Sequence, residues 1–236
     1  MEAIILAGGK AERLGDAARG NPKAIVPIAG HPLAEYQVTQ LLRAGVKRVI
    51  VSCALGQGTL FRHKLSGLGA EIVPAEEPEP LGRGGGLRFA ARSRVDSGPL
   101  FALNGDELLD VDLAEMLRAH RERSAAATIA VAPMTSALGV VDIADDDRVT
   151  GFREAPRLPH WVNIGCYVLD DEAIERLPER GDHEQSTFPE LAAEGRLWAH
   201  RHEGMWLTVN TPKQLRQAEE YYEAHPELRP SLARRA

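Results

Sequence analysis

The strongest constraint on the fold comes at the start of the chain, where a short apolar run leads into a pair of glycines. Residues 3–6, Ala-Ile-Ile-Leu, have the pattern of a strand that is buried on both faces. Gly8 and Gly9 then allow the backbone to turn sharply and to present its N–H groups to a ligand. Arg13 adds a planar, permanently charged group that suits phosphate oxygens, and Lys23 follows a proline-fixed bend. Two glycines after a strand usually form only a tight turn, but the ordered set predicts a polyphosphate-binding site.

The composition narrows the class of protein. The 236 residues can form one large domain or two small ones, and a hydrophobic content of 44% is ample for a core. No apolar run approaches the ~18 residues of a membrane span, and a net charge of −6 without a basic stripe argues against a nucleic-acid partner. Cys53 and Cys166 lie among strand-like residues and are expected to be buried thiols. Since no basic leader opens the chain, we expect a cytoplasmic protein.

The first half of the chain alternates strands with helices. We expect strands at residues 48–52, 70–74 and 99–103, and helices at 32–45, 59–66, 87–94 and 113–123, the last capped by Asp112. Such alternation is typical of βαβ units, so it predicts an α/β fold with a parallel sheet.

The second half changes character, because strands follow one another with few helices between them. The expected strands are residues 126–131, 139–143, 149–154 and 161–169, and the acidic run 145–147 is expected to form a hairpin turn. We assign no metal to that run, because it lacks the spacing of an EF-hand. We expect this half to be a mixed-sheet lid that carries a second substrate. Thr211 and Pro212 predict the start of a closing helix through residue 223.

A strand end in the middle of the chain carries the clearest candidate for ligand binding. The strand at residues 99–103 runs directly into Asn-Gly-Asp at 104–106. An aspartate at the carboxyl end of a buried parallel strand lies where open α/β sheets bind ligands. Asp106 is therefore a candidate site residue, whereas Glu107 and Asp110 are interpreted as solvated neighbours.

The loop at residues 76–86 is rich in glycine. Its core, Pro-Leu-Gly-Arg-Gly-Gly-Gly, has the wrong spacing for a dinucleotide fingerprint. Taken alone, it is interpreted as a flexible crossover loop.

Several motifs, in their order along the chain, resemble a known family. They are L-A-G-G-K-A-E-R-L at 6–14, P-K at 22–23, E-P-E-P-L-G-R-G-G at 77–85, N-G-D at 104–106, E-A-P at 154–156, N-I-G-C-Y at 163–167 and G-M-W-L-T-V-N-T-P at 204–212. This order resembles that of the sugar-1-phosphate nucleotidyltransferases, or NDP-sugar pyrophosphorylases. The motif style is most similar to that of the mannose-1-phosphate and heptose-1-phosphate guanylyltransferases. The resemblance covers roughly residues 1–223.

The resemblance implies a Rossmann-like, GT-A-like α/β fold with a mainly parallel central sheet and a mixed-sheet acceptor-binding half. It implies one nucleotidyltransferase domain over residues 1–223, in a short single-module form. The nucleotide-binding half would span about 1–112, the acceptor-binding half about 113–210 and the closing helix about 211–223, before a tail at 224–236. The implied reaction converts an NTP and a sugar 1-phosphate into an NDP-sugar and pyrophosphate, with Mg²⁺ as cofactor. The loop at 80–86 favours GTP and leaves CTP and UTP open.

The resemblance also implies roles for individual residues. Arg13 would hold the β- and γ-phosphates, Lys23 the α-phosphate and the acceptor phosphate, and Asp106 the Mg²⁺. Main-chain groups of the glycine-rich loop would bind the edge of the base. The implied nucleotide-binding residues are Leu6, Ala7, Gly8, Gly9, Lys10, Leu81, Gly82, Arg83 and Gly85. The implied substrate-binding residues are Gly105, Glu154, Asn163 and Gly165.

Four positions depart from the family pattern. Ala11 and Asn210 stand where the family has glycine. Ala155 replaces a lysine that neutralises the sugar phosphate, and Thr208 replaces an aspartate that shares the Mg²⁺. The neighbouring cations considered as replacements for that lysine are Arg153 and Arg157.

These departures keep two other functions open. One is a transferase acting on a heptose, cyclitol or alcohol phosphate with CTP or UTP. The other is a catalytically silent protein that binds a nucleotide sugar and regulates a partner. The sequence leaves open whether the protein is a monomer or a homodimer.

Overall fold

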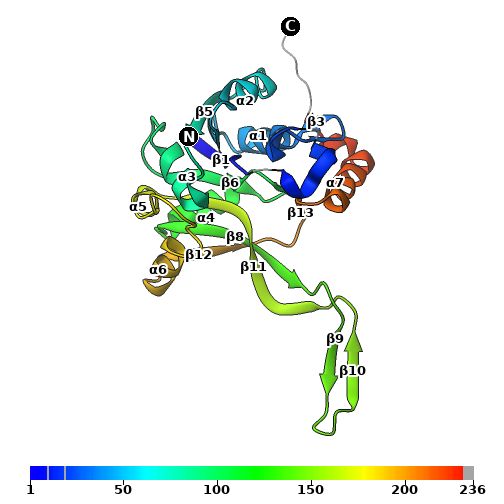
Figure 1. Ribbon diagram of the computed structural model, residues 1–236. Helices are drawn as coiled ribbons and strands as arrows, with labels where there is room; N and C mark the ends of the chain where they lie inside the picture. The colour runs from blue at the N-terminus through cyan, green and yellow to red at the C-terminus, as the bar shows by residue number, and fades with distance from the viewer. Residues whose placement is uncertain (10, 19, 231–236) are drawn as a thin grey trace.

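The computed structural model describes residues 1–9, 11–18 and 20–230. Within them, one seven-stranded sheet forms the centre of the molecule (Figure 1). Across the sheet the strands are β12 (Leu197–Arg201), β8 (Ala127–Thr135), β11 (Arg157–Leu169), β6 (Leu100–Asn104), β1 (Glu2–Leu6), β4 (Arg48–Ala54) and β5 (Glu71–Glu77). β1 runs parallel to both β4 and β6, β4 to β5, and β8 to β12, while β11 is antiparallel to its two neighbours. The expected α/β fold with a mainly parallel sheet is confirmed.

Helices cover both faces of the sheet because the central strands are apolar on both sides. Along β1, Ala3 and Ile5 join one core cluster, and Ile4 joins the other. The helices on the first face are α1 (Leu33–Arg43), α2 (Gly58–Lys64) and α4 (Leu113–Glu122). The helices on the second face are α3 (Gly82–Ala91), α5 (Asp171–Glu175) and α6 (Thr187–Ala193).

A third apolar cluster joins the start of the chain to its closing helix, α7 (Pro212–Ala224). Thr211 caps α7, since its Oγ1 accepts a hydrogen bond from the Gln214 N–H at 3.3 Å, as the sequence predicted. Asp112 caps α4 in the same way. The remaining elements of this region are the 3₁₀ helices η1 (Glu12–Ala18), η2 (Lys23–Ile25) and η3 (Pro226–Leu228), and the strand pairs β2 (Pro27–Ile28) with β3 (His31–Pro32) and β7 (Glu107–Leu109) with β13 (Trp206–Thr208).

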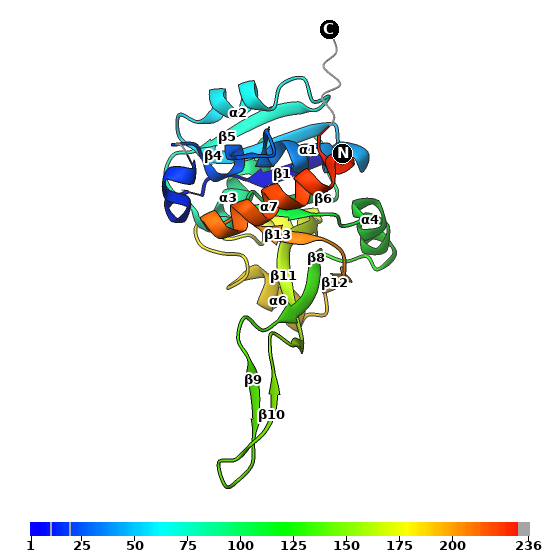
Figure 2. The same ribbon diagram turned by 90° about the vertical axis from the view of Figure 1, so that its right-hand side faces the viewer.

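The second half of the chain, for which we expect a mixed-sheet lid, extends the central sheet. Its strands β8, β11 and β12 continue the same sheet beyond β6, because β11 pairs directly with β6. β9 (Val140–Ile143) and β10 (Val149–Arg153) leave the sheet as a hairpin that stands out from the body of the molecule (Figures 1 and 2). The acidic run 145–147 forms the turn of this hairpin, as predicted.

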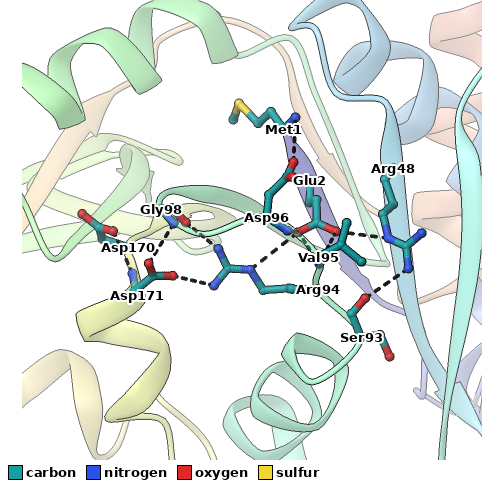
Figure 3. A network of polar contacts seen from close by, with 10 residues as sticks. All are labelled: Met1, Glu2, Arg48, Ser93, Arg94, Val95, Asp96, Gly98, Asp170 and Asp171. Carbon is teal, nitrogen blue, oxygen red and sulfur yellow. Dashed lines mark hydrogen bonds and ion pairs between the residues drawn. The ribbon is translucent and has the colours of Figure 1, made fainter.

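A buried carboxylate fixes the edge of the sheet at the amino ends of the strands (Figure 3). Glu2 is almost fully buried and accepts hydrogen bonds from the N–H groups of Val95 and Asp96. It also forms ion pairs with Arg48 at 3.1 Å and Arg94 at 3.8 Å. Since a buried charge is tolerated only when it is paired, this network holds β1 to β4 and to the segment before β6.

No helix in the described ranges is long and apolar enough to cross a membrane.

Candidate active site

A cavity of about 500 Å³ opens where β1, β5 and β6 end. Its lining residues are Leu6, Ala7, Gly8, Gly9, Arg13, Lys23, Ala24, Glu77, Pro80, Leu81, Gly82, Arg83, Asn104, Gly105, Asp106, Glu107, Asp182 and Asn210. The predicted site residues among them are Leu6, Ala7, Gly8, Gly9, Arg13, Lys23, Leu81, Gly82, Arg83, Gly105 and Asp106. Lys10 lies outside the described residues.

The two central strand ends approach each other closely at the bottom of this cavity. The Gly105 N–H donates to the Leu6 carbonyl at 2.9 Å, and a Cβ on Gly105 would lie 2.3 Å from that oxygen. Only glycine allows this approach. The glycine turn after β1 and the aspartate after β6 are thereby brought to the same edge of the sheet.

Lys23 and Asp106 form the ionic centre of the site. The Lys23 ammonium donates to Asp106 Oδ2 at 3.1 Å and to Asn210 Oδ1 at 2.5 Å. The Asn210 Nδ2 in turn donates to Thr208 Oγ1 at 2.8 Å. Asn210, one departure from the family pattern, therefore contacts the lysine directly, and Thr208, another departure, is linked to it through the asparagine.

Arg13 lies on η1 and lines the same cavity with an exposed side chain. Within the described ranges no ion pair or side-chain hydrogen bond holds its guanidinium, so the group keeps its full capacity for anionic oxygens.

Glu107 is not the solvated neighbour that the sequence suggested. It is only 9% exposed, and its Oε2 accepts a hydrogen bond from Trp206 Nε1 at 2.7 Å. Burial and the adjacent Asp106 raise the pKa of the Glu107 carboxyl to about 7. The error arose because Trp206 comes from β13, far along the chain, and pairs with β7 only in the fold. Asp110 is half exposed and pairs with His202, so it agrees better with the interpretation as a solvated neighbour.

The glycine-rich stretch is a helix N-terminus rather than a flexible loop. α3 begins at Gly82, earlier than the predicted residue 87. The Gly181 carbonyl accepts from the N–H groups of Gly84 and Gly85, and Asp182 Oδ1 accepts from the Arg83 N–H at 2.9 Å. These N–H groups are occupied within the protein, which removes them as donors to a base.

Gly85 packs against the backbone near Glu179 and does not line the cavity. A Cβ at this position would lie 2.7 Å from the Glu179 carbonyl oxygen. No sequence pattern predicts this contact, because the segment around residue 179 is distant in the chain. By contrast, Leu81, Gly82 and Arg83 do line the cavity.

Besides Glu107, two acidic residues of the cavity, Glu77 and Asp182, were not among the predicted site residues. Glu77 ends β5 and is nearly buried; its carboxylate accepts from Ser52 Oγ at 2.6 Å and from the Leu81 N–H at 3.1 Å. The sequence feature that could have identified Glu77 is its position at the end of a strand, within the motif at residues 77–85. Asp182 has no comparable signal, since it comes from the segment between α5 and α6.

Asn163 and Gly165 shape the strand beside the cavity. Asn163 donates to the Tyr167 hydroxyl and accepts from the Gly165 N–H, both at 2.9 Å. Gly165 has φ +71°, and a Cβ there would lie 2.6 Å from the amide nitrogen of Asn104, which lines the cavity. Neither predicted substrate residue is itself part of the lining.

The residues around Ala155 lie at the base of the hairpin, outside the lining of the cavity. Glu154 is exposed. Arg153 pairs with Asp142 at 2.6 Å, and Arg157 pairs with Glu203 at 3.2 Å. Both arginines are thus paired with carboxylates outside the lining of the cavity.

The fold and the cavity define an α/β protein with a ligand site at the carboxyl ends of parallel strands. The sequence comparison is more specific, since residues 2–225 match the nucleotidyl transferase family. The chain belongs to that family, as the order of its motifs had indicated.

Two relatives illustrate this membership. Mannose-1-phosphate guanylyltransferase of Mycobacterium tuberculosis is 32% identical over 225 residues, which are 90% of this chain and 62% of the relative. The catalytic subunit beta of mannose-1-phosphate guanylyltransferase from Xenopus tropicalis is 32% identical over 223 residues, with the same coverage. The chain thus spans about three fifths of the length of these relatives.

Solved structures share the fold. HddC from Yersinia pseudotuberculosis superposes with a TM-score of 0.73 at 22% identity, over 94% of this chain and 99% of HddC. A structure of HddC with GMP-PN gives a TM-score of 0.72. At this level of identity the likeness concerns the fold alone.

Proposed function

We propose that the protein transfers a nucleotidyl group from an NTP to a sugar 1-phosphate, with GTP as the first choice of nucleotide. The observation that carries the proposal is the position of Arg13, Lys23 and Asp106 around one cavity where β1 and β6 end. The names of the related guanylyltransferases support both the reaction class and the choice of GTP. The two free, buried cysteines suit a reducing cytoplasm.

The reaction needs positioned charge more than covalent chemistry. An oxygen of the sugar phosphate attacks the α-phosphorus and forms a new P–O bond, while the bond to the bridging oxygen breaks and pyrophosphate leaves. Negative charge grows on the entering and leaving oxygens, where preorganised cations lower the barrier by several kcal/mol. Lys23 would neutralise the α-phosphate, and the exposed Arg13 would hold the β- and γ-phosphates.

The residues of the site suit Mg²⁺. This ion prefers oxygen ligands and often uses only one or two carboxylates together with substrate phosphates. Asp106 would supply the carboxylate, and Asn210 Oδ1 is a second oxygen bonded to the same Lys23 ammonium. When bound, the ion would neutralise the charge on the phosphates. Among the described residues no group of three or more His, Cys, Asp or Glu side chains gathers as a metal cage. Phosphate oxygens of the nucleotide and water molecules would supply the remaining ligands.

A different acceptor remains the second candidate. Ala155 carries no charge, and its neighbouring arginines pair with Asp142 and Glu203 rather than facing the cavity. A heptose, cyclitol or alcohol phosphate is therefore an alternative to a hexose phosphate.

A screen of pyrophosphate release tests the proposal. Each of the four common NTPs is combined with a panel of sugar and alcohol phosphates, and products are identified by mass spectrometry. The proposal predicts release with one nucleotide, GTP first, and at least one sugar 1-phosphate. Binding of a nucleotide sugar without turnover of any pair would instead identify a silent regulator.

A further inference from the structure

A glutamine of α1 binds the turn that carries Asp106. This turn, residues 104–107, leads from β6 into β7. The Gln37 Nε2 donates hydrogen bonds to the carbonyl oxygen of Asn104 at 2.7 Å and to that of Glu107 at 2.9 Å. A side-chain amide nitrogen carries two hydrogens, so both donors of Gln37 are used on this one turn. The two bonded carbonyls lie on either side of Asp106 in the sequence.

Main-chain hydrogen bonds hold the middle of the same turn. The Gly105 N–H donates to the Leu6 carbonyl, and the Asp106 carbonyl accepts from the Val209 N–H, both at 2.9 Å. These bonds tie the turn to β1 and to the segment after β13, and Gln37 ties it to α1. Three separate parts of the chain therefore fix the backbone that presents the Asp106 carboxylate.

The hydrogen bonds from Gln37 are shielded from solvent. Gln37 is 2% exposed, and Leu33, Ala34 and Val38 on the same helix are fully buried. Because water does not reach this depth, solvent cannot replace a hydrogen bond that is lost there. Removal of the Gln37 amide should therefore loosen the turn.

The amide oxygen of the same side chain has no comparable contact. Within the described part of the chain, Gln37 Oε1 is buried and has no hydrogen-bond partner. A buried acceptor without a partner lowers stability. A methionine, with a similar volume and no amide oxygen, would avoid that cost on this helix. The advantage of glutamine at this position therefore lies in the bonds of its Nε2 to the Asp106 turn.

The position of the turn determines where the Asp106 carboxylate lies. That carboxylate is 3.1 Å from the Lys23 ammonium, and the proposed reaction assigns it to the metal. A displacement of about 1 Å can lower the rate of such a reaction by about a hundredfold. The bonds from Gln37 thus act on the geometry on which the chemistry depends.

We propose that Gln37 is a positioning residue, which holds the turn at 104–107 so that Asp106 meets Mg²⁺ and Lys23 in one fixed geometry. The inference rests on the proposed nucleotidyl transfer. Gln37 is not among the residues that line the cavity, so it acts through Asp106 and does not touch the substrate.

Gln37→Met tests this role, because methionine is unbranched and of similar length but has no N–H donor. The matched control is Gln40→Met. Gln40 lies on the same helix and donates a hydrogen bond to the Val111 carbonyl at 2.9 Å, outside the lining of the cavity. Both variants therefore lose a side-chain bond to a backbone carbonyl, but only Gln37→Met loses contact with the turn.

Steady-state kinetics at varied Mg²⁺ concentration compare the two variants. Gln37→Met should lower kcat/KM by about tenfold or more, the scale of losing a group that orients a metal ligand. It should also raise, several-fold, the Mg²⁺ concentration that gives half-maximal activity, which a loss of stability alone would not do. Gln40→Met should stay within about twofold of the wild type in both quantities.

Amide hydrogen exchange examines the turn without any turnover. The N–H groups of Gly105 and Val209 are the probes, because their hydrogen bonds hold the turn. Gln37→Met should speed their exchange by about tenfold or more, and Gln40→Met should leave it unchanged. Gln37→Glu is a second variant that keeps the shape of the side chain but replaces the donating NH₂ group by an acceptor oxygen, and it should act in the same direction. Far-UV circular dichroism establishes that all three variants are folded.

Two outcomes would overturn the inference. One is unchanged exchange at Gly105 and Val209 in both variants of Gln37, which would mean that the turn does not depend on this side chain. The other is faster exchange with unchanged kcat/KM and unchanged Mg²⁺ dependence, which would make Gln37 a structural residue only. A wild type that turns over no pair of NTP and sugar phosphate contradicts the proposed function instead. The exchange rates and the affinity for GTP with Mg²⁺, measured by calorimetry, then still decide the role of Gln37.

Discussion

The ammonium of Lys23 lies 3.1 Å from Asp106 Oδ2, so the cation and the carboxylate of the site neutralise each other when no ligand is bound. Both groups are largely shielded from solvent, with side-chain exposures of 15% and 26%. A cation that enters beside Asp106 must compete with this ammonium, and a phosphate that approaches Lys23 must compete with the carboxylate. A nucleotide that brings Mg²⁺ satisfies both groups in one binding event.

Asp106→Asn should abolish turnover and preserve the fold. The amide keeps the shape of the side chain but removes the negative charge that holds the metal. We expect a loss of at least about a thousandfold in kcat/KM, measured by pyrophosphate release, with an unchanged circular dichroism spectrum. Near-normal activity at saturating Mg²⁺ would rule out the role assigned to Asp106.

Lys23→Ala should lower kcat/KM by about a hundredfold or more, the scale of one preorganised contact to the transition state. Lys64→Ala is the control. Lys64 is exposed on α2, so this substitution removes the same charge at a position outside the cavity. Steady-state kinetics separate the possible outcomes. A rise in KM for one substrate with an unchanged kcat would mean that Lys23 binds ground state and transition state equally.

Gly85→Ala should destabilise the protein without changing its affinity for nucleotide. The added Cβ would lie 2.7 Å from the Glu179 carbonyl oxygen, so the contact must shift at a cost of about 1–3 kcal/mol. Gly9→Ala is the control for stability. A Cβ on Gly9 meets no atom within 4 Å, so this variant should be about as stable as the wild type. Urea unfolding measures both variants. A Gly85→Ala variant of wild-type stability but weakened nucleotide binding would restore Gly85 to the nucleotide site.

These positions show how far the sequence alone could predict the site. Asp106 and the turn at Gly8 follow buried strands directly, and parallel strand ends meet at one edge of a sheet, so their convergence was predictable. Gly85 and Glu107 depend on partners that are distant in sequence, Glu179 and Trp206. Local pattern carries no information about such contacts. The outward position of the β9–β10 hairpin was unpredictable for the same reason, because alternating apolar residues do not reveal what covers them.

Arg83→Thr should change the KM for NTP or the preference among NTPs. Arg83 lines the cavity and is 54% exposed, but its guanidinium is held by Glu184 at 2.5 Å. Glu184→Gln should weaken that hold and change the same parameters while leaving the arginine in place. Michaelis constants for the four NTPs decide the question. Unchanged values for every nucleotide in Arg83→Thr would mean that the ion pair with Glu184 is its whole role.

Thr208→Asp should create Mg²⁺ binding in the absence of nucleotide. In the wild type Thr208 lies opposite Glu107 in the β13–β7 pair, and its hydroxyl accepts a hydrogen bond from Asn210. Since Glu107 is tied to Trp206 and Lys23 pairs with Asp106, the free protein offers the metal little charge. A carboxylate at position 208 would supply the second ligand that Mg²⁺ accepts.

Isothermal titration calorimetry with MgCl₂ alone measures this effect. We expect no detectable binding to the wild type at low millimolar concentration and clear binding to Thr208→Asp. The matched control is Thr208→Asn, which introduces a side chain of nearly the same shape without the charge, and it should behave like the wild type. Tight Mg²⁺ binding by the nucleotide-free wild type would mean that Glu107 leaves Trp206 and completes the metal site. The neutral hydroxyl of Thr208 would then not determine whether the metal binds together with the nucleotide.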